Sequence, residues 1–300
     1  MGSPILPAII RSFSGMARQK FQGLLFFGVL ICLCVPGFAK AAEAVRALPM
    51  TFDSRERITK PDLSGLTRLR FLTTVDFPPF NFIDQDGRLA GFHIDLAREI
   101  CRVLAIEARC QVQALTFDEL LPALSEGQGE AVLSGVKVTP ALRRGYGFSR
   151  PFMMLPARFA GNRTRMGETL TVAALQGKPV GVVAGTVHEA MAKAFFPTLD
   201  RRPFPDRAAL MAALKDGSVA AVFGDGVQLG FWTASAEAGG CCAMLPGAYL
   251  SEDFLGEGLT VALRKDDAVL KQAIDHALLE LSRSGRLNEL ALRYFPMGLY

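Results

Sequence analysis

A serine and a lysine at the spacing of a known nucleophile motif are the first candidates for chemistry. Ser134-Gly135-Val136-Lys137 fits S-x-x-K, in which the serine attacks an acyl group. The S-D-N and K-T-G motifs that accompany it in such enzymes are absent, and Ser134 follows a predicted strand instead of lying on a helix. We therefore interpret the match as coincidental.

The histidines and cysteines lack the spacing of a metal site. His188-Glu189 has no further histidine at ligand spacing, and no C-x-x-C pair occurs. The phosphate-binding pattern G-x-x-x-x-G-K-[ST] is absent as well, so the chain is not expected to hydrolyse nucleotides. The sequence predicts no catalytic residue, no metal and no cofactor.

Alternating strand-like and helix-like segments must position the polar residues, from about Leu69 onward. The letters of residues 120–135, LLPALSEGQGEAVLSG, align without gaps on LMAALKDGSVAAVFGD of residues 210–225. The repeat suggests two lobes of similar α/β topology, each with a parallel sheet and right-handed crossovers.

Ligands of such sheets lie beyond the carboxyl ends of the strands. This rule selects residues 74–77 and 134–137 in the first lobe, and residues 185–186 and 224–225 in the second. We expect the selected loops of the two lobes to face each other across a cleft. Thr116-Phe117-Asp118-Glu119 fits a capping box and predicts the start of a helix beside the first pair of loops.

The first 42 residues have the pattern of a secretory signal peptide. A basic front precedes nineteen uncharged residues, 21–39, and a Pro-Gly break and an A-x-A site close the segment. An uncleaved membrane anchor is the alternative, since nineteen residues could just span a bilayer. The break and the A-x-A site favour cleavage, so we expect a periplasmic protein. Residues 43–65 are interpreted as an N-terminal arm or linker.

Removing residues 1–42 leaves 29 basic and 29 acidic residues. The net charge of the mature chain is therefore zero, and the sequence predicts no nucleic-acid partner. Four cysteines remain and allow three pairings. Cys101 ends a predicted helix and Cys110 begins the next strand, so we expect a disulfide between them. Cys241 and Cys242 are adjacent, and we expect free thiols or a labile bond there.

Seven blocks of the sequence resemble, in order, those of the family-3 solute-binding proteins, the periplasmic amino-acid receptors of ABC importers. The blocks extend from about Leu69 to Phe295. The resemblance implies a Venus-flytrap fold with two crossovers, with residues 66–155 plus 253–300 in lobe 1 and 156–252 in lobe 2. The blocks are LRFLTTVDFPPFNF, DGRLAGFHIDLAREIC, FDELLPALSEGQGEAVLSGVKVT, FSRPF, GKPVGVVAGT, GEGLTVALRKDD and SGRLNELALRYF.

The resemblance also implies ligand-binding roles for six residues, matched by position. Such roles suit a zwitterion, which needs anion donors, an acidic partner for its ammonium group and aromatic faces. The matched residues are Phe77 and Phe117 as the ligand sandwich, Ser134 and Gly135 in the carboxylate-binding loop, Thr186 at a helix start near the carboxylate, and Asp225 as the partner of the ammonium group.

Three departures from the family pattern leave the ligand open. Leu142 stands where the family's Thr-x-x-Arg motif has the arginine that holds the carboxylate, and Lys137 could supply a charge instead. Val187 replaces a common hydroxyl residue, and Thr74 replaces the acid that is frequent in binders of cationic side chains.

The resemblance implies a monomeric binding protein without catalysis, whose partners are an inner-membrane permease and its ATPase. The same scaffold leaves two alternatives open, an enzyme resembling cyclohexadienyl dehydratases and a sensory module of a membrane receptor. Turnover of prephenate or arogenate would identify the enzyme, and the absence of neighbouring transporter genes would favour the sensor.

Overall fold

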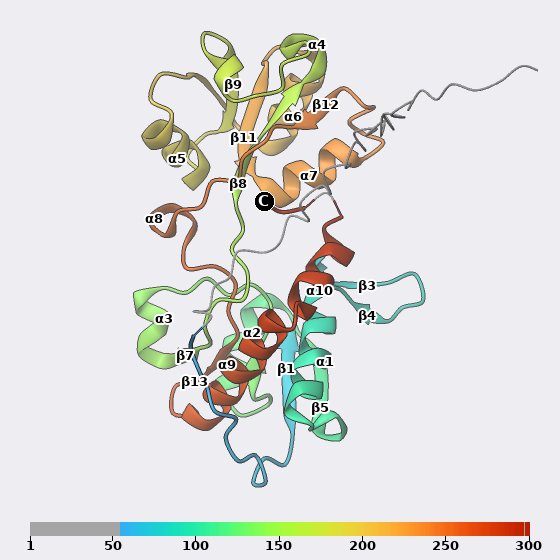
Figure 1. The fold of residues 1–300 in the computed structure, drawn as a ribbon, viewed down its shortest axis with the longest axis vertical. Helices are drawn as coiled ribbons and strands as arrows, with labels where there is room; N and C mark the ends of the chain where they lie inside the picture. The colour runs from blue at the N-terminus through green and yellow to red at the C-terminus, as the bar shows by residue number, and fades with distance from the viewer. Residues whose placement is uncertain (1–54, 297) are drawn as a thin grey trace, which may run out of the picture. The chain divides into compact units, whose positions relative to one another are not determined.

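The computed structural model describes residues 55–296 and 298–300. The signal peptide expected at 1–42 and the first part of the arm lie outside the described residues. The described chain folds into two lobes, each built around one five-stranded sheet (Figure 1). None of the described helices is long and apolar enough to cross a membrane.

The first lobe contains a sheet with the strand order β5-β1-β6-β13-β7. Strand β1 pairs in parallel with both β5 and β6, whereas β13 runs antiparallel to β6 and β7. The strand bounds are β1 (Leu69–Thr73), β5 (Cys110–Ala114), β6 (Ala131–Val132), β7 (Tyr146–Phe148) and β13 (Ala262–Arg264).

The second lobe repeats this arrangement with the order β10-β9-β11-β8-β12. Strand β9 is parallel to β10 and β11, and β8 is antiparallel to β11 and β12. The strand bounds are β8 (Ala157–Asn162), β9 (Pro179–Val183), β10 (Asp200–Phe204), β11 (Ala221–Asp225) and β12 (Cys242–Met244).

The expectation of purely parallel sheets was wrong for two strands in each lobe. The three neighbouring parallel strands of each sheet are joined through helices, which is the connection that parallel pairing requires. Strands β7 and β13, and β8 and β12, have no such crossover into the sheet, so nothing forces them into the parallel direction. Both sheets are therefore mixed, with the parallel strands on one side.

Helices of the first lobe include α1, α9 and α10, which pack against one another (Figure 1). Their apolar faces are buried in one large cluster with Leu69 and Phe71 of the sheet. The helices of this lobe are α1 (Phe92–Leu104), α2 (Phe117–Ser125), α3 (Pro140–Gly145), α9 (Ala268–Arg283) and α10 (Arg286–Tyr294); those of the second are α4 (Arg163–Met166), α5 (Val187–Phe195), α6 (Arg207–Asp216) and α7 (Gly226–Ala234). The short helix α8 (Glu252–Leu255) lies across the predicted lobe boundary and contacts α5.

The sequence repeat corresponds to one structural unit in each lobe, a helix followed by a strand. Residues 120–135 include most of α2 and all of β6, and residues 210–225 include most of α6 and all of β11. Gly127 and Gly217 match in the repeat and follow the two helices by two residues and by one, with φ of 74° and 79°. A side chain is disfavoured in this left-handed region, so glycine ends both helices and turns the chain into the strand.

The described part of the N-terminal arm, residues 55–65, contacts the first lobe without forming a helix or strand. Lys60 Nζ donates to the carbonyl oxygen of Leu104 at 2.7 Å, and the ring of His276 meets the carbonyl oxygen of Ile58 at 2.7 Å. Leu63 is buried in the main cluster of this lobe. The arm therefore adds both apolar burial and hydrogen bonds to the back of α1 and α9.

Two disulfides are present in the described residues. One joins Cys101 at the end of α1 to Cys110 at the start of β5, with their Cα atoms 6.4 Å apart. The other joins the neighbours Cys241 and Cys242, whose state the sequence left open between thiols and a labile bond. Cys242 is buried at the start of β12.

Replacing both Cys101 and Cys110 by alanine is expected to lower the free energy of unfolding by about 2–3 kcal/mol. The bond closes a loop across nine positions, and opening it restores that entropy to the unfolded chain. Urea unfolding followed by circular dichroism measures the change. The double alanine variant of Cys241 and Cys242 is the control. It also truncates one buried cysteine, but the disulfide that it removes joins sequence neighbours and closes almost no loop. An equal loss of unfolding free energy in both variants would contradict the loop account.

Candidate functional site

The carboxyl ends of three neighbouring parallel strands gather the first set of predicted site residues at one edge of the first sheet. Strand β1 leads into Phe77, β5 leads through Thr116 into Phe117, and β6 leads into Ser134 and Gly135. The edge position follows from the parallel pairing, because parallel strands end on the same side.

Phe77 lies directly against the Ser134–Gly135 loop. A Cβ atom placed on Gly135 would come within 2.9 Å of Phe77 Cε1, and Gly135 has a φ of 69°. Only glycine allows this approach without strain. The ring of Phe77 stacks on Phe80 at 4.7 Å between centroids, so its position is fixed from behind.

Phe117 is the first residue of α2, and 52% of it is exposed. The helix begins there because Thr116 and Glu119 form the predicted capping box, in which Thr116 N donates to Glu119 Oε2 at 3.0 Å. An exposed aromatic side chain at this edge can stack on a flat or cationic group.

A buried polar network lies behind the loop and joins four side chains. Thr74 Oγ1 and Ser134 Oγ are 3.0 Å apart, and Asn81 Nδ2 donates to Thr74 Oγ1 at 2.7 Å and to Ser134 Oγ at 3.3 Å. Asn81 Oδ1 lies 2.6 Å from His93 Nδ1. Because the amide oxygen can only accept, His93 carries its proton on Nδ1.

The direction of these hydrogen bonds leaves one of the two hydroxyl protons, of Thr74 or of Ser134, without an acceptor inside the network. Asn81 donates to Thr74, so the Thr74 and Ser134 hydroxyls share one further hydrogen bond but hold two protons. No other acceptor for either hydroxyl is found in the described part of the chain. When Thr74 donates to Ser134, the proton of Ser134 is available to an acceptor outside the network, at the loop that the sequence analysis selected.

His93 stays neutral because it is enclosed by aromatic rings. The centroids of Phe80, Phe152 and Phe92 lie 5.0, 5.9 and 6.0 Å from the imidazole centroid. Burial lowers the pKa of His93 from 6.5 to about 3. Its Nε2 is buried without a hydrogen-bond partner among residues 55–296 and 298–300, so protonation there would create an unpaired charge in the core.

The stability of the protein is expected to fall as the pH is lowered from 6.5 towards 3. The unfolded chain takes up a proton at His93 near pH 6.5, whereas the folded chain resists it down to about pH 3, so the contribution is complete above 6.5. By pH 4.5, two pH units below the unfolded pKa, the loss attributable to His93 should be about 3 kcal/mol. Urea unfolding of wild type and His93→Phe across pH 4.5–7.5 measures it.

The loss of the Asn81 hydrogen bond in His93→Phe lowers stability at every pH by a constant amount, so the slope of the difference is the informative quantity. A difference between the two proteins that does not change with pH would contradict the neutral, buried state of His93. His276→Gln, which also removes a histidine, serves as the control.

No cation of the first lobe stands at the position of the Thr-x-x-Arg arginine, which Leu142 occupies in this chain. Leu142 is half-buried and packs in an apolar cluster of the lobe. Arg143 forms an ion pair with Glu257 and lies 5.9 Å from the ring centroid of Phe148. Lys137 is exposed. Lys137 is therefore the cation that remains on the selected loop.

The second lobe brings Thr186 and Asp225 together in a cavity of about 260 Å³. Thr186 caps α5 after β9, and Asp225 ends β11 and caps α7. Polar and apolar groups both line the cavity, which suits a small molecule that carries charge on a carbon skeleton. The lining residues are Val183, Thr186, His188, Arg207, Leu210, Met211, Phe223, Gly224, Asp225, Gln228 and Leu229.

Gln228 links the carboxylate of Asp225 to the guanidinium of Arg207 in this cavity. Gln228 N donates to Asp225 Oδ1 at 2.9 Å, and Arg207 Nη1 donates to Gln228 Oε1 at 2.8 Å. His188 stands beside them, and burial lowers the pKa of its imidazole while the negative charge of Asp225 raises it. The cavity thus holds one fixed carboxylate, one fixed guanidinium and an imidazole that burial biases to the neutral form.

The start of α5 already has an acidic partner. Glu189 Oε2 accepts from Gly185 N at 2.7 Å, and Thr186 Oγ1 accepts from Glu189 N at 3.2 Å while donating to Val183 O at 2.7 Å. The carboxylate of Glu189 therefore occupies the position at which a helix start attracts an anion. Thr186 lines the cavity, but its hydroxyl proton is already donated to Val183 O.

Arg207 and Gln228 were not predicted as site residues, and His188 was considered from the sequence only as a metal ligand. Arg207 follows β10, whose sequence DRRPF is charged and was not recognised as a strand. Had β10 been assigned, the same rule for strand ends would have selected the loop before α6, because β10 is the parallel neighbour of β9.

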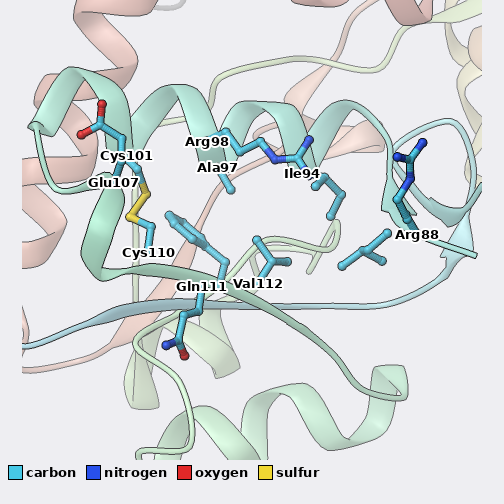
Figure 2. A pocket seen from close by; sticks show the side chains of 11 residues that line it. Arg88, Ile94, Ala97, Arg98, Cys101, Glu107, Cys110, Gln111 and Val112 are labelled. Atoms are coloured by element: carbon cyan, nitrogen blue, oxygen red, sulfur yellow. A yellow bond between two sulfur atoms is a disulfide. The ribbon is translucent and has the colours of Figure 1, made fainter.

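A larger cavity of about 430 Å³ lies in the first lobe between α1 and β5, away from the loops that the sequence selected (Figure 2). The Cys101–Cys110 disulfide lines one end and Arg88 the other. Its arginines are paired, Arg98 with Asp95 at 2.9 Å and Arg88 with Asp86 at 2.6 Å. Both arginines of this groove are therefore already engaged by acids of the chain.

Groups of three or more potential metal ligands do not occur within residues 55–296 and 298–300. The candidate site is therefore described by its hydroxyls, its aromatic rings and the charged pair of the second lobe. These groups can hold a small polar molecule by hydrogen bonds, stacking and charge.

Comparison with known proteins identifies one family. The model of the bacterial extracellular solute-binding proteins, family 3, matches residues 69–297. The lysine/arginine/ornithine-binding periplasmic protein of Escherichia coli is 28% identical over 275 residues, 91% of this chain and 98% of that protein. The L-arginine-binding protein of Pseudomonas aeruginosa is 28% identical over 228 residues, 75% of this chain and 86% of that protein.

A solved structure supports the same fold. The L-cystine solute receptor of Neisseria gonorrhoeae, in its unliganded open conformation, aligns with a TM-score of 0.65 at 17% identity. The alignment covers 76% of this chain and 92% of that one. At this identity the likeness concerns the two-lobed fold alone.

Proposed function

The chain belongs to the bacterial extracellular solute-binding proteins of family 3, and on that premise we propose that it captures a small amine-bearing, amino-acid-like molecule and delivers it to an ABC importer. We assign residues 66–155 plus 253–300 to lobe 1 and residues 156–252 to lobe 2. The expected partners are an inner-membrane permease and its ATPase, and a monomer binds the solute.

The observation that carries the proposal is the placement of Asp225 and Thr186 in one cavity of the second lobe. Asp225 is half-buried, and one of its carboxylate oxygens accepts from Gln228 N. The other oxygen remains for an ammonium group, and such a charge-assisted hydrogen bond is the strong kind. Relatives named for arginine, lysine and histidine support an amino-acid-like ligand.

The first lobe contributes the rest of the proposed site. Phe77 and Phe117 supply aromatic faces, and Ser134 has a proton to donate when Thr74 donates to it. Gly135 lets the ring of Phe77 lie against this loop, and Lys137 adds a point charge on the same loop. Binding that engages both lobes favours the closed state, which the permease would recognise.

We propose a binding role without catalysis, because the matched relatives are named as binding proteins. A thermal-shift screen of amino acids, amines and small acids identifies the ligand, since binding raises stability by RT ln(1 + [L]/Kd). Incubation with prephenate or arogenate tests the enzyme alternative, and any turnover would contradict the binding role.

Exported protein is expected to begin near Ala42 or Glu43 and to be recovered from the periplasm. The short apolar segment and the A-x-A site at 39–41 are the reason. N-terminal sequencing after osmotic shock checks this expectation. An intact Met1 in the membrane fraction would show that the segment is an anchor.

Asp225→Asn is expected to weaken binding of an amine-bearing ligand by two to four decades. The loss of a charge partner that closure buries costs about 3–5 kcal/mol. Asparagine still caps α7 as aspartate does, so the fold should be kept. Isothermal titration calorimetry with the ligand from the screen measures the change.

Asp200→Asn is the matched control, because it removes an equal charge from the opposite end of the same sheet. Equal affinities of wild type and Asp225→Asn would place the ammonium group elsewhere. Asp225→Ala should lose binding as well, with an additional loss of stability from the missing helix cap.

A further inference from the structure

We propose that Arg207, in the second lobe, holds the carboxylate of the ligand, so that one lobe binds both charged groups of a zwitterionic α-amino acid. The inference rests on the proposed function, because it takes the ammonium group to lie at Asp225. It adds a carboxylate site that neither the sequence pattern nor the resemblance indicates.

The place of the family's carboxylate-binding arginine is closed in this chain. Leu142 stands there, and its side chain packs in the apolar cluster of the first lobe. Arg143 is engaged by Glu257 and the face of Phe148, and Arg144 donates to the carbonyl oxygen of Pro140 at 3.4 Å. A guanidinium for a ligand carboxylate must therefore come from another element.

The start of α5 already holds a carboxylate, that of Glu189. Gly185 N is bonded to Glu189, and the Thr186 hydroxyl donates its proton to Val183 O. A second carboxylate at this position would meet the negative charge of Glu189 without a free donor from either group. Apart from the Ser134–Gly135 loop, two carboxylate sites were expected from the family pattern. Leu142 replaces the arginine of the first, and Glu189 occupies the second, at the start of α5.

Arg207 has the geometry of a prepared anion site. It is the first residue of α6, fixed there because Asp206 Oδ1 accepts from Ala209 N at 2.8 Å. One guanidinium nitrogen donates to Gln228 Oε1 at 2.8 Å, which anchors one side of the fork. The remaining N–H groups have no protein acceptor in the described residues, and a carboxylate can accept two of them.

The charges of the cavity match the ligand in sign and number. Arg207 and Asp225 both line the same space of about 260 Å³, on either side of Gln228. A zwitterion placed there pairs its carboxylate with the guanidinium and its ammonium group with the carboxylate of Asp225. Apolar surface for the carbon skeleton is close by, in the lining side chains Leu210, Met211, Phe223 and Leu229.

Calorimetry with matched ligand pairs tests this assignment. Each pair is an amino acid and the amine that lacks only its carboxylate: L-arginine and agmatine, L-lysine and cadaverine, L-histidine and histamine. For any pair that wild type binds, Arg207→Gln should weaken the amino acid about 10- to 100-fold and leave the amine within about 2-fold. Arg207→Lys should lie between, because it keeps the charge but loses the fork.

Arg202→Gln is the matched control, because it removes an equal charge from β10 outside the cavity, and it should change the affinity for the amino acid by less than about 3-fold. Lys137→Gln tests the alternative cation of the first lobe. Arg207 is exposed, and a thermal melt of each variant checks that the fold is kept. Two results overturn the assignment of Arg207. In one, Arg207→Gln leaves the affinity for the amino acid unchanged; in the other, it lowers the affinities for the amino acid and for its amine equally. A loss specific to Lys137→Gln also overturns it.

The failure of the proposed function has a different signature. A wild-type protein that binds no amino acid in a screen of all the standard ones overturns both proposals together. Binding that is abolished by Asp225→Asn but indifferent to Arg207→Gln overturns the carboxylate site alone.

Discussion

The parallel pairing of three neighbouring strands in each sheet is the constraint on which the site depends. In the second lobe, β9 pairs with β10 from Pro179↔Asp200 to Val183↔Phe204, and β11 pairs with β9 on its other side. Strands held in this register end at one edge, so the residues that follow them meet in one cavity. The first lobe repeats the arrangement with β5, β1 and β6. Short polar sequences far apart in the chain thus become neighbours without a dedicated element to bring them together.

Support behind the loops comes from two amide side chains that link the site residues to one another. In the first lobe the Asn81 amide connects a neutral, ring-enclosed His93 to the hydroxyls of Thr74 and Ser134. In the second, Gln228 connects Asp225 to Arg207 through its backbone and side chain. Both connectors are amides, which donate and accept at once and carry no charge of their own. They hold hydroxyls and charges in place while leaving the net charge of each site to the residues at its surface.

The sequence predicted the elements whose pattern depends on burial or capping. The strand-like pattern that begins near Leu69 located β1, and the capping box at Thr116 located the start of α2. Strand β10 was not predicted from the sequence, because DRRPF lies at a sheet edge, where charged residues are tolerated. Helix α7 was not predicted either, because it is apolar, contains glycines and shows little helical periodicity. The same gap hid part of the site: Asp225 and Thr186 end or follow recognised strands, whereas Arg207 follows the unrecognised one. The antiparallel strands could not be predicted, because their direction depends on the path between the lobes.

A crystal structure of the protein with the amino acid found by the ligand screen tests the central claim most directly. The account predicts the ammonium nitrogen about 2.8 Å from an Asp225 carboxylate oxygen, in the cavity that Thr186 also lines. A ligand bound elsewhere, such as in the groove between α1 and β5, with Asp225 still facing solvent, would contradict it.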